Sequence, residues 1–184
     1  MPINRTQNEI ISLCVKTSLL LLLLWISACS EGGNENKLET GRKKAKEEVR
    51  EDLIKWQQRF YQKIDRGERK KYGRKLLAKY RGFIGRFPKD EKVPEYLYEA
   101  ASLAHNHLND YQEAAKLYRL MEERYPEHPK APVALFKEAV VRMELKEYEQ
   151  ARTKFRALLR RYPEADLAPD ARKQLNTLQE KSVD

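Results

Sequence analysis

The sequence predicts an all-α fold, a short solenoid of helical hairpins that follows a signal peptide and a flexible tether. Three observations support this prediction. No stretch alternates polar and apolar residues as a strand would. Lys, Glu, Arg, Leu and Ala are abundant from residue 46 onward, and glycine does not recur after Gly85. A pattern of aromatic and proline residues recurs every 37–38 residues.

Residues 1–28 are organised like a secretory signal peptide. Arg5 and Lys16 come first, an apolar run from Leu19 to Ile26 follows, and small residues end the segment. The run is much shorter than the ~20 residues that a membrane-spanning helix needs, which disfavours a permanent transmembrane segment. We therefore expect residues 1–28 to be removed from the mature protein.

The signal ends in Ile26-Ser27-Ala28-Cys29, which resembles the lipobox of bacterial lipoproteins. In that family the cysteine receives a diacylglyceryl group and, after cleavage, an acylated amino terminus, so that several acyl chains hold the protein on the membrane. The resemblance implies lipidation of Cys29. The alternative is an ordinary cleaved signal followed by a chance cysteine. Because Cys14 lies inside the signal, no second cysteine remains for a disulfide or a catalytic thiol.

Residues 29–45 are predicted to be the acylated cysteine and a flexible tether. The segment is polar, contains three glycines and has no apolar period. Ser30 follows the cysteine, where lipoproteins retained in the inner membrane of proteobacteria carry aspartate. The resemblance therefore implies a protein on the outer membrane, lipid-anchored and facing the periplasm.

Residues 46–184 are expected to form one helical repeat domain with a continuous core. The repeat is clearest between residues 111–126 and 148–163, which are 37 residues apart. Aromatic, small, apolar and proline positions coincide in Tyr111/Tyr148, Ala114/Ala151, Tyr118/Phe155, Met121/Leu158, Tyr125/Tyr162 and Pro126/Pro163. A third copy lies 38 residues earlier and contains Tyr80, Phe83, Phe87 and Pro88.

A second proline stands six residues after the first in each copy, at Pro94, Pro132 and Pro169. The first proline ends a helix, because the residue before it is driven out of the αR region. The second suits the first turn of the next helix, where a missing N–H costs little. The predicted segments are a degenerate helical pair over 46–88, repeats over 94–128 and 132–165, and a capping helix over 169–181. Short turns are predicted at 109–110 and 146–147.

This unit resembles the tetratricopeptide repeat. The family's small residue in helix A is matched by Ser102 and Ala139, and its alanine, aromatic and proline in helix B by Ala114 and Ala151, Tyr118 and Phe155, and Pro126 and Pro163. The period exceeds the family's usual length of about 34 residues, and Gly73 replaces the tyrosine of the other copies. The longer repeat with a Tyr-Pro ending is similar to that of the outer-membrane β-barrel assembly lipoproteins (the BamD-like family) and of the Tol-associated periplasmic coordinator.

No motif indicates catalysis, a cofactor or a metal site. His105 and His107 are two residues apart on a predicted helix, so they point to opposite sides and cannot share a metal ion. With His128 they are interpreted as solvated polar positions. Gly82 and Gly85 fall in a helical pattern and are interpreted as small residues at a helix contact, not as an RNA-binding loop. Phosphate-loop, serine-nucleophile and HExxH motifs do not occur. We expect no enzyme activity, no cofactor and no small-molecule substrate.

Without residues 1–28 the chain has 35 basic and 27 acidic residues, a net charge of +8. Much of the excess forms a basic patch of Arg69, Lys70, Lys71, Arg74, Lys75, Lys79 and Arg81. Nucleic acid is not an expected partner, because a secreted lipoprotein does not routinely meet it. Anionic lipid headgroups, cell-wall polymers or an acidic protein are better candidates. The alternative is a hydrated surface that only keeps the protein soluble.

A second apolar stripe on the predicted helix 132–146 indicates a partner-binding groove. The resemblance places Val133, Phe136, Val140 and Met143 on the groove side of this helix, with Tyr96 and Leu103 as counterparts one repeat earlier. An extended peptide or a partner helix would lie along them. The alternative is that neighbouring helices cover the stripe.

Two functions follow as hypotheses. The first is a lipid-anchored scaffold of the bacterial envelope that binds other envelope proteins and assists outer-membrane β-barrel assembly, as the resemblance implies. The second is a structural adaptor that links the envelope to cell-wall or division machinery. The residues themselves identify neither the partner nor the oligomeric state.

Overall fold

The computed structural model describes residues 36–62 and 65–180. The predicted signal peptide (1–28) and the predicted lipidation site Cys29 lie outside the described residues. Within the described ranges, no helix combines the length and the apolar character that crossing a bilayer requires. The chain divides into two compact units, residues 1–48 and 49–184.

Residues 36–48 of the first unit are helical, which corrects the predicted flexible tether for residues 36–45. This segment lacks an apolar stripe, and its residues 36–44 are exposed. A helix that is polar all round depends on side-chain pairs such as Lys43 Nζ to Glu39 Oε1, which are 3.2 Å apart. The helical residues continue to 61, and extending an existing helix costs much less than starting one. The absence of an apolar period was therefore insufficient to predict a tether.

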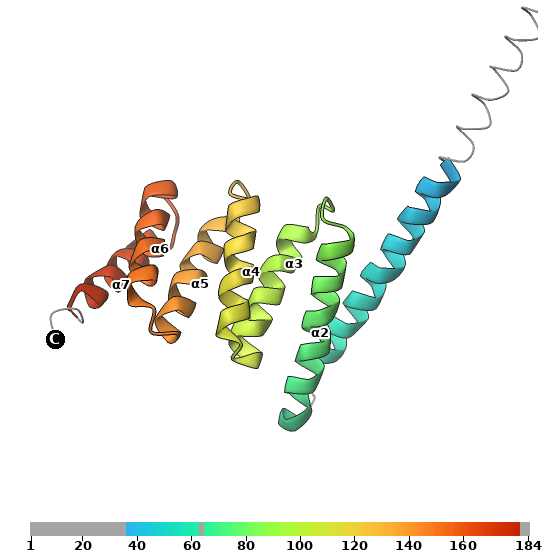
Figure 1. Cartoon of the computed structure of the whole chain (residues 1–184), viewed down its shortest axis with the longest axis horizontal. Helices are drawn as coiled ribbons and strands as arrows, with labels where there is room; N and C mark the ends of the chain where they lie inside the picture. The colour runs from blue at the N-terminus through green and yellow to red at the C-terminus, as the bar shows by residue number, and fades with distance from the viewer. Residues whose placement is uncertain (1–35, 63–64, 181–184) are drawn as a thin grey trace, which may run out of the picture. The chain divides into compact units, whose positions relative to one another are not determined.

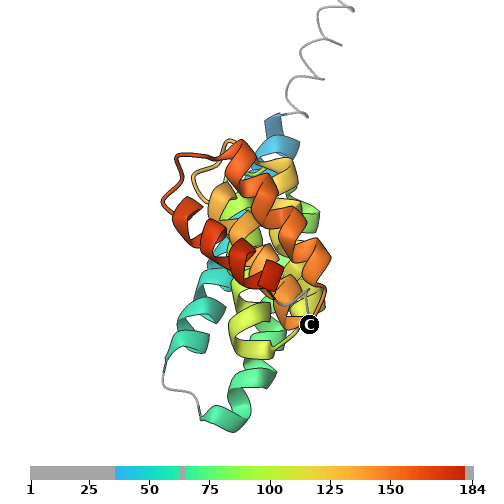
Figure 2. The same ribbon diagram turned by 90° about the vertical axis from the view of Figure 1, so that its left-hand side faces the viewer.

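In the second unit, a leading helical segment, residues 49–61, comes first, and a row of short helices follows it (Figures 1 and 2). In chain order these are α2 (Arg66–Arg86), α3 (Val93–Leu103), the π-helix η1 (Ala104–Leu108), α4 (Tyr111–Arg124), α5 (Ala131–Glu144), α6 (Tyr148–Arg161) and α7 (Ala168–Glu180). From α2 onward, each helix packs on the next one along the chain. No strand occurs among the described residues. The predicted all-α solenoid of helical hairpins is confirmed.

Three proline-bounded links, residues 87–93, 125–131 and 162–168, share one backbone hydrogen-bond pattern. In each, the fourth residue donates to the carbonyl of the first and the seventh donates to the carbonyl of the fourth, at 2.8–3.1 Å. Pro94 and Pro132 stand in the first turns of α3 and α5, where a helix does not need the missing N–H. The paired prolines thus mark the end of one helix and the beginning of the next, as predicted.

A tyrosine hydroxyl ties the second and the third link to the link before it. Tyr125 Oη donates to the carbonyl of Pro88 at 3.3 Å, and Tyr162 Oη donates to the carbonyl of Pro126 at 2.9 Å. The tyrosine and the proline of the repeated Tyr-Pro motif therefore act in successive copies. The tyrosine reaches back one repeat, and the proline supplies the acceptor for the next.

The two turns within the repeats use a left-handed residue at the same place. Asn109 has a φ of 55° and Lys146 a φ of 61°, a conformation that asparagine tolerates better than lysine. Asp110 then caps α4 by accepting the Glu113 N–H at 3.2 Å. The equivalent Glu147 makes no such cap, and its carboxylate instead pairs with Arg142 in the preceding helix.

Corresponding aromatic residues of α2, α4 and α6 form the centre of the core. Tyr80, Tyr118 and Phe155 are at most 1% exposed. Gln57 Nε2 donates to the hydroxyl of Tyr80 at 2.6 Å, so this buried polar group has a partner. Burial raises the pKa of Tyr80 and of Tyr118 well above the ordinary value for a phenol. Both hydroxyls therefore stay neutral across the physiological pH range.

The glycines of α2 have two different environments. A Cβ added at Gly82 or Gly85 would meet no atom within 4 Å, so the predicted helix contact at these residues is wrong, although both lie in a helix. A Cβ at Gly73 would lie 2.9 Å from Leu108 Cδ2 and 3.2 Å from Phe60 Cε2. Gly73 is the position where α2 closely approaches its neighbours.

Candidate protein-interaction surface

The end of the first helix of repeat 94–128 is a π-helix, which accommodates one more residue than the same stretch of α-helix. The sequence contains this extra residue as a difference in spacing. Pro94 and Tyr111 are 17 residues apart, whereas Pro132 and Tyr148 are 16 apart. Residues of α3 therefore correspond to residues of α5 at an offset of 38, and the offset of 37 applies only after η1.

Two aromatic pairs agree with the offset of 38. The rings of Tyr98 and Tyr118 have centroids 5.8 Å apart at an interplanar angle of 64°. The rings of Phe136 and Phe155 are 5.3 Å apart at 66°. Both are edge-to-face contacts between the first and second helix of a repeat. Tyr98 and Phe136 thus occupy equivalent positions.

The sequence prediction for Tyr96 and Leu103 is wrong, because these side chains belong to the core. With the offset of 38 they correspond to Ala134 and Val141, and all four residues are at most 7% exposed. Tyr96 packs edge-on against Phe83 of α2 at 5.0 Å. A one-residue error in register turns a helical position by about 100°, which is enough to exchange a surface position for a core position.

The apolar stripe of α5 lies at the surface with only part of each side chain exposed. Val133, Phe136, Val140 and Met143 are all of intermediate burial. Phe136, Val140 and Met143 pack against the core between α5, α6 and α7. Neighbouring helices therefore cover the inner side of the stripe, and its outer side meets solvent.

The equivalent surface of α3 is formed by Tyr98 and Ser102, which the sequence analysis did not select. Both are half-buried and correspond to Phe136 and Val140. We call the six residues Tyr98, Ser102, Val133, Phe136, Val140 and Met143 the A-helix face, because they line the first helix of each repeat. Counting the residues between Pro94 and Tyr111 would have identified its α3 part.

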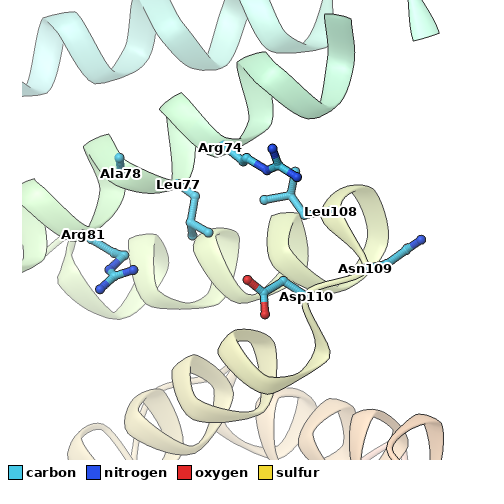
Figure 3. A pocket seen from close by; sticks show the side chains of 7 residues that line it. All are labelled: Arg74, Leu77, Ala78, Arg81, Leu108, Asn109 and Asp110. Carbon is cyan, nitrogen blue, oxygen red and sulfur yellow. The ribbon is translucent and has the colours of Figure 1, made fainter. Parts of the chain in front are cut away.

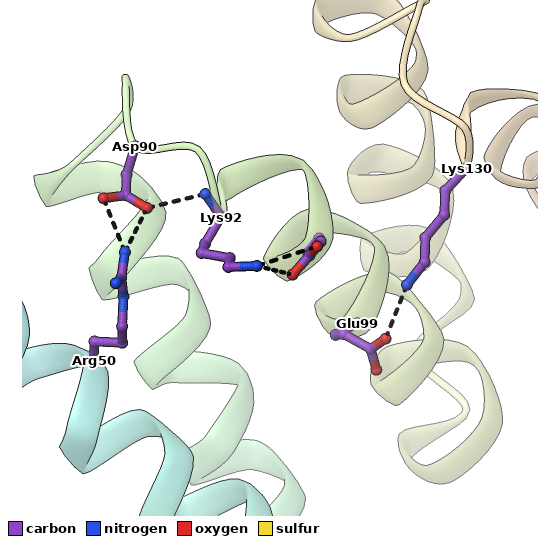
Figure 4. A network of polar contacts seen from close by, with 6 residues as sticks. Arg50, Asp90, Lys92, Glu99 and Lys130 are labelled. Carbon is purple, nitrogen blue, oxygen red and sulfur yellow. Dashed lines mark hydrogen bonds and ion pairs between the residues drawn. The ribbon is translucent and has the colours of Figure 1, made fainter.

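Lys130 connects the α3 and α5 parts of the A-helix face. Its Nζ lies 3.5 Å from Glu99 Oε1 (Figure 4) and 4.7 Å from the centroid of the Tyr98 ring. Burial, followed by the charge of Glu99, raises the pKa of Tyr98, so its hydroxyl remains a donor at neutral pH. The α3 half of the face is thus amphipathic and the α5 half apolar.

A buried carboxylate holds the first link against the leading helical segment (Figure 4). The Asp90 side chain is 2% exposed and accepts from Arg50 at 3.1 Å and from the Lys92 N–H at 2.9 Å. In the second link, His128 Nδ1 accepts the Lys130 N–H in the same way at 3.1 Å. The ring of His128 is therefore a structural cap, which its interpretation as a solvated residue did not foresee.

The basic patch lies along α2 and divides into two sides. On one side, the Nζ atoms of Lys75 and Lys79 lie 5.7 and 5.4 Å from the centroid of Trp56, and Lys79 also pairs with Asp52. Arg69, Lys70 and Lys71 are exposed. Lys75 and Lys79 therefore bind the leading helical segment while they contribute positive charge.

On its other side, the patch contributes Arg74 and Arg81 to a hollow of about 490 Å³ (Figure 3). Leu77, Ala78 and Leu108 form the apolar part of its lining, and Asp110 lies across from the two arginines. Arg81 contacts Glu113 at 3.5 Å. The structure thus brings two of the seven predicted basic residues to one concave site.

His105 and His107 are half-buried rather than solvated. His105 packs near Tyr111 at 5.8 Å, and His107 packs edge-on against Phe60 at 5.1 Å. Burial lowers the pKa of both imidazoles; Lys137 adds to this effect at His105 and Arg69 at His107. Within the described residues, no group of three or more His, Cys, Asp or Glu side chains is arranged to hold a metal ion.

Two buried glutamates, one in α5 and one in α4, form ion pairs with basic side chains of α6. Glu138 of α5 has a fully buried side chain, 2.9 Å from Lys154 Nζ in α6. Glu122 of α4, with a side chain 3% exposed, pairs with Arg161 of α6. The apolar pattern used for the sequence analysis does not reveal such residues, because they break it.

Comparison with known proteins identifies one of the repeats. Residues 133–165 match the family model described as Tetratricopeptide repeat. The match covers most of α5 and all of α6, and therefore the apolar half of the A-helix face. It supports a tetratricopeptide-repeat protein. A search of curated proteins gave no significant match.

Proposed function

We propose that this chain is a lipid-anchored scaffold of the bacterial cell envelope, attached through Cys29 to the outer membrane and facing the periplasm, which assists the assembly of outer-membrane β-barrel proteins. The family match over residues 133–165 supports protein binding, because tetratricopeptide repeats are protein-interaction folds. The observation that carries the proposal is the partly exposed apolar stripe of α5 beside the amphipathic surface of α3.

The cellular part of the proposal rests on two resemblances. The order of charged, apolar and small residues before Cys29 resembles a lipoprotein signal. The long repeat with its Tyr-Pro ending is similar to the repeats of β-barrel assembly lipoproteins.

Partner capture with matched variants tests the scaffold. Val133→Glu places a charge on the A-helix face, at a half-buried residue. Ile54→Glu makes the same change at an aliphatic residue that is 40% exposed in the leading helical segment. The tagged full chain is extracted from membranes, and its partners are identified by mass spectrometry. We expect wild type and Ile54→Glu to retain β-barrel assembly components and Val133→Glu to lose them.

Capture of cell-wall or division proteins in their place would favour the adaptor function. Equal capture by all three chains would exclude the A-helix face as the binding surface. Circular dichroism of each variant separates a lost contact from lost folding. Phe136 is a poorer choice for this test because it also packs on Phe155.

The anchor is tested separately. Cells that express wild type and Cys29→Ser are labelled with radioactive palmitate, and their inner and outer membranes are separated. We expect label on the wild-type chain in the outer membrane and none on Cys29→Ser. Label on both variants would contradict lipidation at Cys29, and wild-type chain in the inner membrane would contradict the proposed location.

A further inference from the structure

The positive charge of this protein is concentrated in one hairpin. Residues 49–86 contain thirteen Lys and Arg and four Asp and Glu, a net charge of +9 that equals the net charge of the whole chain. The remaining residues contain twenty-four of each kind. A fixed excess of this size attracts an acidic partner to the hairpin and not to the rest of the chain.

The hollow beside α2 provides a concave site within this positive region. Arg74 and Arg81 are seven residues apart on one helix, which corresponds to a rise of about 10.5 Å. Leu77 lies between the two arginines, and Leu108 lies next to Arg74 (Figure 3). The site therefore combines two guanidinium groups with an apolar floor.

Both arginines have N–H donors left for a ligand. Within residues 36–62 and 65–180, no ion pair is formed by Arg74, which is exposed. Arg81 uses one nitrogen for Glu113 at 3.5 Å, and its side chain is 58% exposed. A guanidinium group has five donors in a planar fork, which suits a carboxylate.

Asp110 determines which kind of anion suits the hollow. Its carboxylate lies across from the arginines (Figure 3) and repels a small anion that would fill the space. A peptide avoids this repulsion, because it carries its carboxylates on separate side chains and offers backbone N–H donors to Asp110. A phosphodiester group has acceptor oxygens and no donor of its own, so it does not relieve this repulsion.

We propose that this hollow binds an acidic segment of a partner protein, with two carboxylates three residues apart held by Arg74 and Arg81. In the polyproline II conformation, residues i and i+3 lie on the same side of the chain about 9 Å apart, close to the spacing of the two arginines. The methylene groups of the acidic side chains rest on Leu77 and Leu108. This inference rests on the proposed protein-binding function and adds a second docking site outside the A-helix face.

Binding of two isomeric peptides tests the spacing. The full chain in a non-ionic detergent is titrated against a fluorescent peptide with the core Glu-Pro-Pro-Glu, and against its isomer Pro-Glu-Glu-Pro, by fluorescence anisotropy at low salt. Both have the same charge and composition. We expect the first to bind at least about fivefold more tightly, because only it reaches both arginines. Equal binding, or no binding, would overturn the proposal.

Charge-matched variants test the site. Arg74→Gln with Arg81→Gln should weaken binding of Glu-Pro-Pro-Glu about tenfold or more, and Lys70→Gln with Lys71→Gln, which removes two exposed charges outside the hollow, about twofold at most. Equal losses would mean general electrostatic attraction. If the first variant fails to fold, Arg74→Lys with Arg81→Lys keeps the charge but loses the fork, and it should weaken binding about threefold or more.

Two further probes test whether a lipid headgroup or a simple anion, and not an acidic segment, occupies the hollow. Vesicles containing phosphatidylglycerol that bind through Arg74 and Arg81 while the peptide does not would assign the site to a lipid headgroup. Inorganic phosphate that displaces the peptide at equal concentration would indicate a simple anion site. Both results would overturn the acidic-segment proposal. Because the assay requires neither membrane nor native partner, its failure leaves the scaffold function intact, and failure of partner capture leaves this site intact.

Discussion

Glycine-to-alanine substitutions within α2 test how closely the helices pack around Gly73. At Gly73 an added Cβ would lie 2.9 Å from Leu108 Cδ2, 3.2 Å from Phe60 Cε2 and 3.6 Å from Leu103 Cδ1. At Gly82 it would meet nothing within 4 Å. No described glycine has a positive φ, so neither backbone conformation excludes alanine. The two substitutions therefore differ mainly in packing.

The expected magnitudes follow from two opposing effects. Alanine in place of glycine inside a helix stabilises the fold by about 0.5–1 kcal/mol. An extra methyl group in a filled space costs about 1–3 kcal/mol. Gly82→Ala should therefore raise the free energy of unfolding by about 0.5–1 kcal/mol, and Gly73→Ala should leave it unchanged or lower it by up to about 2.5 kcal/mol. The difference between the two variants, about 1–3 kcal/mol, is the quantity to measure.

Urea denaturation followed by circular dichroism gives both values from midpoints and slopes. A third variant, Gly73→Ala with Leu108→Ala, removes the closest contact, so the double variant should be more stable than the sum of the two single effects implies. Equal stability of Gly73→Ala and Gly82→Ala would refute the close approach. Additive effects of Gly73→Ala and Leu108→Ala would refute Leu108 as its cause.

Three further predictions concern a turn, a link and two histidines. Lys146 has a φ of 61°, a conformation that costs a residue with a side chain about 1 kcal/mol. Lys146→Gly should therefore raise the free energy of unfolding, measured in urea, by up to about 1 kcal/mol. A decrease would contradict the described turn. Tyr162→Phe removes the donor to the Pro126 carbonyl and should lower the free energy of unfolding by about 0.5–1.5 kcal/mol. An unchanged value would mean that this hydrogen bond is no stronger than the one that the hydroxyl makes with water in the unfolded chain. Burial lowers the pKa of His105 and of His107 below the ordinary value of 6.5, so the unfolded chain binds more protons below about pH 6.5. The stability that the neutral histidines provide should be complete above about pH 6.5 and should decline as the pH falls below it. His105→Gln should make the urea midpoint fall less over this pH range. An unchanged pH dependence would contradict the lowered pKa of His105.

The helices of the repeats could be predicted because residues close to each helix end determine where the helix begins or ends. Pro94 and Pro132 begin helices, and the residues before Pro126 and Pro163 end them, for reasons that concern only the adjacent backbone. The helical state of residues 36–45 was missed because it does not depend on an apolar stripe. Continuation of a neighbouring helix and pairs such as Glu39 with Lys43 support it instead.

The candidate surface was predicted correctly on α5 to the extent that its stripe lies at the surface, and incorrectly on α3. Offsets taken from α4 and α6 were applied to α3, where η1 adds a residue. The buried residues Tyr96 and Leu103 were consequently assigned to the groove, and the surface residues Tyr98 and Ser102, which correspond to Phe136 and Val140 at the offset of 38, were missed. The hollow beside α2 was beyond sequence reasoning, because Arg74 and Asp110 are brought together only by the packing of α2 on η1 and the turn after it.

The first copy of the repeat departs from the others at positions where its surroundings differ, so its irregularity is structural. Gly73 replaces a tyrosine where α2 approaches Phe60 and Leu108 too closely for a tyrosine side chain. Phe87 replaces the tyrosine that binds the preceding proline carbonyl in later copies. One period before Pro88 stands Arg50, inside a helix, where carbonyls already have backbone partners. A hydroxyl at residue 87 would therefore lack the acceptor that Tyr125 and Tyr162 use, so phenylalanine serves this position without leaving an unpaired donor.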